Sequence, residues 1–181
     1  MRPLGYLYKR VAKRPGWLKA TQVDDIYSLS GCISTPFADY IRYWKHNGCW
    51  LFDSPAAIER LAISNAISLE GLRLFYYEAH EEQYDDKKRA WEPYAPEDAL
   101  AATVDVPLGK TLEGFDVTSF SAGTAPECSP LSCNACAEGI KTNRHCLFAT
   151  FEEAVQAVES GRFRNCEPGP YRVIGVFTVQ E

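Results

Sequence analysis

The residues best suited to chemistry are cysteines, and four of the seven lie within 19 positions, at Cys128, Cys133, Cys136 and Cys146. His145, one of three histidines, directly precedes the last of them. Thiolates and imidazoles are preferred ligands of Zn²⁺, and a structural zinc site takes four of them in a tetrahedron. Cys133 and Cys136 could supply two ligands, and Cys128 with His145 or Cys146 could complete the set. One interpretation is therefore a zinc site, and the expected cofactor is zinc or none.

Two other interpretations of the same segment stay open. A reduced cysteine behaves as a small apolar side chain and is often buried, so these cysteines could be structural thiols packed under a loop. A catalytic interpretation takes Cys128 or Cys133 as a thiolate nucleophile whose pKa is lowered by His145. The sequence identifies no third group to orient such a pair, and our primary expectation is that the chain has no catalytic residue.

A second group of residues is typical of binding surfaces. Tyr43 and His46 fall off the apolar stripe of a helix expected at residues 36–47, and Trp50 follows this helix. Trp17 lies among the five basic residues of a segment that we expect to be a solvated loop. Because tyrosine and tryptophan are enriched at protein interfaces, we predict that these four residues contribute to a binding surface.

Composition narrows the class of protein. Hydrophobic residues make up 46% of the 181 positions and charged residues 24%, which is typical of a globular domain with its own core. The net charge of −5 argues against a dedicated nucleic-acid binder, since such proteins usually carry a basic excess. No apolar run approaches the ~20 residues that span a bilayer, and the N-terminus lacks the apolar region of a secretory signal. An odd number of cysteines then favours reduced thiols or metal ligands in a cytoplasmic protein.

The elements that must position these residues are strands and short helices. Two helices are expected to begin with the cap-then-proline pairs at Thr35 and Ser54, and a third with the capping box of Thr150 and Glu153. This pattern predicts an α+β fold with a mixed or antiparallel sheet and two to three helices on one face. Helices are expected at residues 36–47, 53–66 and 150–160, and strands at residues 4–8, 25–30, 50–52, 72–79, 104–106, 115–120, 146–148 and 171–179.

The chain is expected to form a single α+β domain over residues 1–181. Its elements also suggest an internal duplication, because a strand, a helix cap, a helix and a long strand follow one another twice. The two halves, 22–80 and 113–181, would be related by a pseudo-twofold axis and joined by an exposed segment at 81–100 that is rich in charge and proline. Convergent use of the same capping residues also explains the similarity, so both interpretations are kept.

These observations favour a protein-interaction, immunity or regulatory module without catalytic activity, whose partner is another protein. The reasons are the acidic charge, the many aromatic residues and the lack of an assembled catalytic set in the sequence. Two alternatives remain. One is a cysteine-dependent or metal-dependent enzyme that uses the loop from Cys128 to Cys146, and the other is a small zinc-stabilised binding domain. The sequence indicates no oligomeric state.

Overall fold

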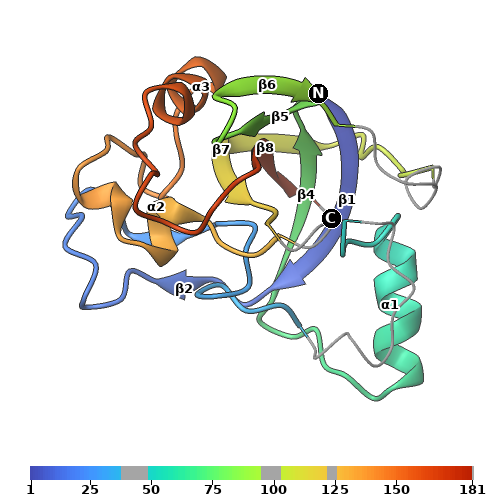
Figure 1. The fold of residues 1–181 in the computed structure, drawn as a ribbon. Coiled ribbons are helices and arrows are strands. Elements are labelled where there is room, and N and C mark those ends of the chain that lie inside the picture. The colour runs from blue at the N-terminus through green and yellow to red at the C-terminus, as the bar shows by residue number, and fades with distance from the viewer. Residues whose placement is uncertain (38–48, 95–102, 122–125, 181) are drawn as a thin grey trace.

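The structure is a computed structural model that describes residues 1–37, 49–94, 103–121 and 126–180. One six-stranded, antiparallel sheet dominates it, with the strands β1 (Arg2–Lys9), β4 (Arg73–Ala79), β5 (Glu82–Asp85), β6 (Ala90–Pro93), β7 (Lys110–Ser119) and β8 (Tyr171–Val179). β8 pairs with β4, β5 and β7, while β1 pairs with β4 and β6 with β5. Figure 1 shows that this sheet is strongly curved.

Strand β8 holds the sheet together because it pairs with three strands and contributes buried apolar side chains to both faces. Ile174 and Val176 pack in one buried cluster with side chains of β1 and β4. Tyr171 and Val173 pack in a second cluster, which includes the buried face of α3 (Phe151–Glu159). A strand that is buried on both faces requires a nearly continuous apolar run, and the end of the sequence provides one.

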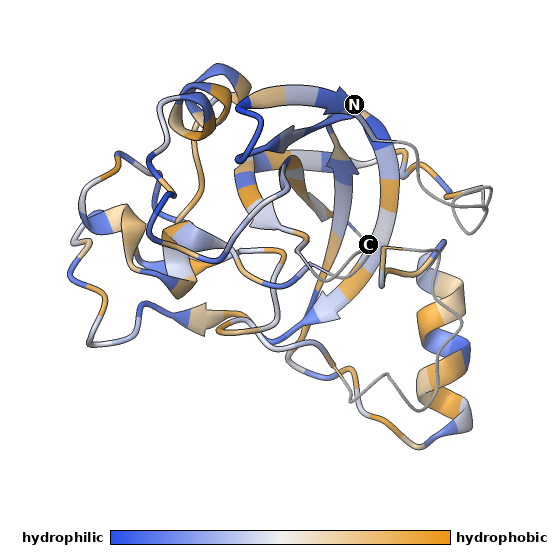
Figure 2. Cartoon of the chain, in the orientation of Figure 1, coloured by the Kyte–Doolittle hydropathy of each residue, from blue (hydrophilic) through white to orange (hydrophobic). Residues whose placement is uncertain are grey.

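The predicted caps do begin two of the helices. The Ser54 hydroxyl accepts a hydrogen bond from a backbone amide at the start of α1 (Pro55–Ser64), at 3.3 Å. The Thr150 hydroxyl accepts one from the Glu153 amide at the start of α3, at 3.2 Å. Hydrophilic and hydrophobic bands alternate along α1 (Figure 2), which buries its apolar side against the sheet. Two shorter helices lie in the cysteine segment, α2 (Pro130–Cys133) and the 3-10 helix η3 (Cys136–Glu138).

The α+β class and the mostly antiparallel sheet are thereby confirmed. The placement of the helices on one face stays a prediction. Several short apolar runs predicted as strands make isolated contacts instead: Phe52 and Phe148 each form a single bridge, and residues 104–106 hold no strand. The strand predicted from Asp25 onward is only β3 (Asp25–Ile26), paired with β2 (Ala12–Lys13). Apolar character alone does not tell a buried strand from a buried loop.

Two larger predictions concern segments rather than single elements. The predicted helix at residues 36–47 lies outside the described residues from position 38 onward. The charged segment predicted as an exposed hairpin tip or linker contains the β5–β6 hairpin, and Tyr84 of β5 pairs with Tyr171 of β8. The internal duplication stays a prediction. The strands expected to correspond are paired differently, because β7 pairs with β8 whereas β3 pairs with β2.

A buried ammonium at the end of β1 fixes the loop that follows β3. Lys9 is fully buried, and its Nζ donates hydrogen bonds to the carbonyls of Ser28, Leu29 and Ser30 at 2.5, 3.0 and 2.8 Å. Three carbonyls that converge on one point need a donor with three hydrogens, which an ammonium supplies. The expectation of a solvated basic loop is therefore wrong for Lys9, the first residue of that segment.

A buried carboxylate on β7 holds the same loop from a second direction. Oδ2 of Asp116 accepts hydrogen bonds from the Leu29 amide at 2.8 Å and from the Ser129 hydroxyl at 2.6 Å. Ser129 directly precedes α2, so this carboxylate joins the loop after β3 to the start of α2. Burial raises the pKa of Asp116 to about 6, and burial also lowers the pKa of Lys9 to about 7.

Replacement of Lys9 with methionine keeps the side chain long and apolar but removes the donor. We expect Lys9→Met to lower the free energy of unfolding by about 3–5 kcal/mol, because three buried carbonyls lose their partner and the buried carboxylate loses a nearby positive charge. Urea titration followed by tryptophan fluorescence measures the change. Lys13→Met alters an exposed lysine on β2 and is the control, with an expected shift below ~0.5 kcal/mol. Equal unfolding midpoints for the two variants would contradict the role of the buried ammonium.

The raised pKa of Asp116 predicts a pH dependence of stability. Between the ordinary value of 3.8 and about 6, the folded chain binds a proton on this carboxylate that the unfolded chain does not bind. The contribution of Asp116 to stability therefore falls by up to ~3 kcal/mol as the pH rises through this window. Asp116→Asn should remove this component, which urea unfolding at pH 4, 5 and 6 measures. Parallel profiles for the wild type and the variant would show that the carboxylate does not titrate there.

Candidate functional site

Three cysteines from two distant parts of the chain line one pocket. Cys32 lies in the loop after β3, Cys128 precedes α2, and Cys133 ends it. The pocket has a volume of about 480 Å³, and its wall also includes Trp17 and Glu167. Cys32 is exposed, Cys133 is partly exposed and Cys128 is buried, so the three thiols extend from solvent into the protein.

Strand β7 and helix α2 position two of these cysteines. The carbonyl of Cys128 accepts a hydrogen bond at 2.8 Å from the amide of Ser119, the last residue of β7. The amide of Cys133 donates to the carbonyl of Ser129 at 2.9 Å, in the single turn that forms α2. Because the Ser129 hydroxyl is held by Asp116, the turn that carries Cys133 is anchored to β7 at its first residue.

The Lys9 and Asp116 network positions the third cysteine. Hydrogen bonds from Lys9 and to Asp116 hold residues 28–30 in place. The Ser30 amide also donates a hydrogen bond to Oγ of Ser129 at 3.3 Å. Two residues further on, the Cys32 thiol lies 3.5 Å from the carbonyl of Glu127. The loop after β3 and the start of α2 are therefore bound to each other as well as to the sheet, which keeps Cys32 beside the other two cysteines.

Within this cluster, the pKa values of the thiols are shifted in different directions. The neighbouring thiols of Cys128 and then Cys32 lower the pKa of Cys133 from its usual value of 9, while the Cys128 thiol donates to Oδ1 of Asn134 at 3.1 Å. The Ser30 hydroxyl, 3.3 Å from the same sulfur, acts in the same direction. The contact with Cys133 is also the main cause that raises the pKa of Cys32 and of Cys128. These directions favour the ionisation of Cys133 ahead of that of Cys32 and Cys128.

The buried Lys9 is electrostatically coupled to this cluster. Burial lowers the pKa of Lys9, and the acidic groups of Asp116 and then Cys133 act in the opposite direction. A lysine charge that a thiolate stabilises favours that thiolate in return. The network that fixes the loop is therefore coupled to the ionisation of Cys133.

His145 lies in a different environment from the one that the catalytic interpretation required. Its Nδ1 is 2.5 Å from Oδ1 of Asp25, its Nε2 is 3.6 Å from Oε2 of Glu113, and its ring stacks on Tyr27 at 4.0 Å. In the described part of the chain, no hydrogen bond joins the imidazole to Cys133 or to Cys128. The side chains that lower the pKa of Cys133 are other thiols and a hydroxyl group.

The remaining two predicted zinc ligands also lie apart from the pocket. Cys146 is fully buried in the apolar cluster beneath α3, and burial raises its pKa to about 12. The Cys136 sulfur lies 3.3 Å from the sulfur of Cys166. Across residues 1–37, 49–94, 103–121 and 126–180, no group of three or more His, Cys, Asp or Glu side chains is arranged to hold a metal ion. Of the five residues predicted as zinc ligands, the structure keeps Cys128 and Cys133 in one pocket and places Cys136, His145 and Cys146 outside it.

Of the four residues predicted to contribute to a binding surface, Trp17 lies at the cysteine pocket. Its side chain is 52% exposed. Trp50 is partly buried, and Tyr43 and His46 lie outside the described residues. Cys32 and Glu167 were missed by the sequence patterns. Neither has a local signature, because each joins the pocket only through contacts with segments far away in the sequence.

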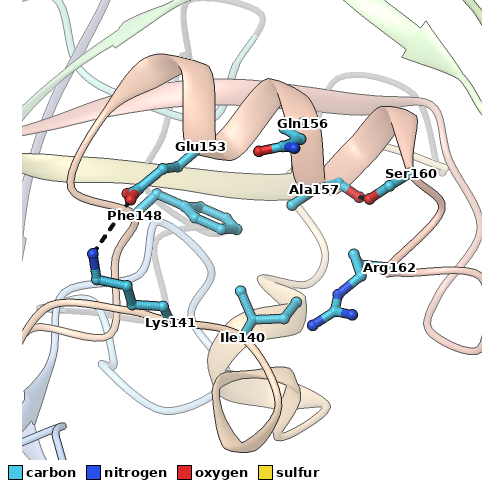
Figure 3. Close-up of a pocket in the computed structure, with 8 residues that line it drawn as sticks. All are labelled: Ile140, Lys141, Phe148, Glu153, Gln156, Ala157, Ser160 and Arg162. Atoms are coloured by element: carbon cyan, nitrogen blue, oxygen red, sulfur yellow. Dashed lines mark hydrogen bonds and ion pairs between the residues drawn. The ribbon is translucent and has the colours of Figure 1, made fainter.

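A second pocket of about 480 Å³ runs along α3 (Figure 3). Phe148 and Ile140 supply its apolar part, and Lys141 and Arg162 supply positive charge. Lys141 forms an ion pair with Glu153 at 3.7 Å, which is the dashed contact in Figure 3. Arg162 donates a hydrogen bond to a backbone carbonyl of the facing loop at 2.5 Å.

Comparison of the chain with protein families, with characterised proteins and with solved structures gives no match. No helix in the described ranges is long and apolar enough to cross a bilayer. What the chain can do must therefore be argued from its own geometry, which is that of an α+β domain with a cluster of three thiols on an open pocket.

Proposed function

We propose that this chain is a cysteine-dependent redox protein in which Cys133 is the reactive thiolate and Cys32 or Cys128 is the second thiol of a reversible disulfide. The observation that carries the proposal is the convergence of three thiols on one pocket that opens to solvent. Reactive cysteines in proteins are ionised, accessible and often lie next to a second thiol that resolves the first product. All three properties are combined around Cys133.

The proposed reaction is thiol–disulfide exchange. The Cys133 thiolate attacks one sulfur of a disulfide substrate, and the other sulfur leaves as a thiolate that takes up a proton. The thiol of Cys32 or Cys128 then loses its proton and attacks the Cys133 sulfur, which releases the second half of the substrate. The chain is oxidised by two electrons, and the substrate is reduced to two thiols.

The walls of the pocket favour particular substrates. The exposed indole of Trp17, with the neighbouring Ile33, offers an apolar contact for a side chain of the substrate. Glu127 and Glu167 place carboxylates beside the thiols, which disfavours an anionic disulfide and favours a neutral or cationic one. A disulfide carried on another protein meets both conditions, and that agrees with the protein partner expected from the sequence.

An interaction, immunity or regulatory module without turnover is the second candidate. It is favoured by apolar side chains that are exposed outside the thiol pocket, among them Ile63 and Leu108. Such side chains can be contact points for a partner, although single exposed apolar residues are common on protein surfaces. The two candidates differ in one respect that can be measured, because only the first requires Cys133 to react.

Alkylation with isotope-coded iodoacetamide between pH 5 and 9 tests the ionisation of Cys133. Because its pKa is lowered, we expect its labelling rate to rise less steeply with pH than the rates of the other cysteines. Cys136 and Cys166 have raised pKa values, so their rates should increase by up to ~10-fold per pH unit. Peptide mapping by mass spectrometry assigns each rate to its residue. A single pH profile shared by all cysteines would contradict a distinct thiolate at Cys133.

Reduction of a small neutral disulfide, hydroxyethyl disulfide, in the presence of a thiol reductant tests turnover. We expect Cys133→Ser to lower the rate at least ~100-fold, because the attacking thiolate is lost. Cys32→Ser and Cys128→Ser identify the resolving thiol, since the variant that lacks it should accumulate a mixed disulfide on Cys133. Cys49→Ala removes a buried thiol outside the pocket and should keep the wild-type rate. If Cys133→Ser keeps that rate as well, the interaction module becomes the better proposal.

A further inference from the structure

A second pair of cysteines lies close together outside the pocket of Cys133. The sulfur atoms of Cys136 and Cys166 are 3.3 Å apart, and both side chains are partly exposed. Cys136 begins the 3-10 helix η3, whereas Cys166 lies in the turns between α3 and β8. The pair therefore joins two segments that are 30 positions apart in the sequence.

The two residues can form a bond without disturbing the sheet. A disulfide has a sulfur–sulfur distance of about 2.05 Å, so the two sulfurs need to approach by little more than ~1 Å. Both cysteines belong to turns, and neither takes part in a strand pairing. Small movements of turns require less free energy than movements of strands that are hydrogen-bonded in a sheet.

A positive charge lies beside this pair. Cys136 shares a shallow pocket with Arg162 and Ile140, and these two residues also line the pocket along α3 shown in Figure 3. The guanidinium donates one hydrogen bond to the carbonyl of Gly139 at 2.5 Å, which leaves N–H groups for a further acceptor. An arginine beside a thiol is suited to hold a carboxylate of an incoming molecule.

We propose that Cys136 and Cys166 form a second redox-active dithiol that exchanges with small anionic disulfides, with Arg162 binding a carboxylate of the substrate. The Cys136 thiolate attacks one substrate sulfur, and the other half leaves as a thiolate and is protonated. Cys166 then gives up its proton and attacks the Cys136 sulfur, which releases the second half of the substrate. Two protein thiols and one disulfide become a protein disulfide and two small thiols, so atoms and electrons balance.

The charged residues that line the two pockets differ. Glu127 and Glu167 line the pocket of Cys133, whereas Arg162 is the charged residue in the lining of the pocket that contains Cys136. Glu167 also acts on Cys136 and Cys166, so Arg162 supplies the difference between the two sites. The charge of a small disulfide should therefore change the ratio of the rates at which it oxidises the two sites. This second site does not rest on the proposed function of Cys133, and it can be tested independently of it.

Oxidised glutathione, which carries several carboxylates, is the anionic probe, and cystamine is the cationic probe. Incubation of the reduced wild type with limiting oxidised glutathione should give a Cys136–Cys166 disulfide, and the ratio of this disulfide to any disulfide at Cys133 should be higher than with cystamine. Peptide mapping after alkylation identifies the products. If the folded chain still presents Cys136 and Cys166 as separate thiols after oxidised glutathione, or accumulates glutathione on Cys136 without resolution, the proposal is wrong.

A charge variant tests the role of the guanidinium. Arg162→Gln should slow the formation of the Cys136–Cys166 disulfide by oxidised glutathione about fivefold, and leave the rate with neutral hydroxyethyl disulfide unchanged. Arg164→Gln alters an exposed arginine outside this pocket and is the matched control, with no change expected for either probe. Equal rates for the two variants with oxidised glutathione would overturn the assignment of Arg162.

The thermal midpoint reports whether the native fold accepts the bond. A disulfide between Cys136 and Cys166 closes a loop across 30 positions and restricts the unfolded chain. It should raise the melting temperature of the oxidised chain by about 5–10 °C over that of the reduced chain. Cys136→Ser and Cys166→Ser should each abolish that rise, and Cys133→Ser should leave it intact. Loss of the rise in Cys133→Ser would assign the effect to the first site, and a lower midpoint on oxidation would show that the fold does not accommodate the pair. Either result overturns the proposal.

Discussion

A buried ammonium and a buried carboxylate together hold the segments that make up the thiol site. Lys9 binds three consecutive carbonyls of the loop after β3, and Asp116 binds the amide of that loop and the hydroxyl at the start of α2. Because buried charges are costly unless they are hydrogen-bonded, the loop can leave this arrangement only by exposing them or leaving them without partners. The position of Cys32 beside Cys133 follows from that constraint.

The sheet supplies the fixed ends of this network. Lys9 ends β1 and Asp116 lies within β7, and these strands reach each other through β4 and β8. β8 is central because its side chains are buried on both faces. A short helix such as α2 has little stability of its own. Its attachment to β7 through Asp116 gives it a defined position, and so gives Cys133 one as well.

The cysteines are divided among three environments with different chemistry. The pKa of Cys133 is lowered by neighbouring thiols and a hydroxyl. Cys136 and Cys166 form a pair next to an arginine, and Cys146 packs as an apolar side chain in the core. The expectation of thiols packed under a loop therefore holds for one of the four cysteines in that segment. The four cysteines between positions 128 and 146 are close in the sequence but do not form one site.

The sequence by itself determined the elements whose signals are local. The caps at Ser54 and Thr150 and the apolar run of β8 were all found from their own residues, because capping and strand burial depend on neighbours along the chain. Only the tertiary structure decided that Lys9 is buried and that Cys32 meets Cys133. Both depend on contacts with loops far away in the sequence. The neighbours of Lys9 along the chain are basic and indicate an exposed lysine, and only its contacts with residues 28–30 show that it is buried.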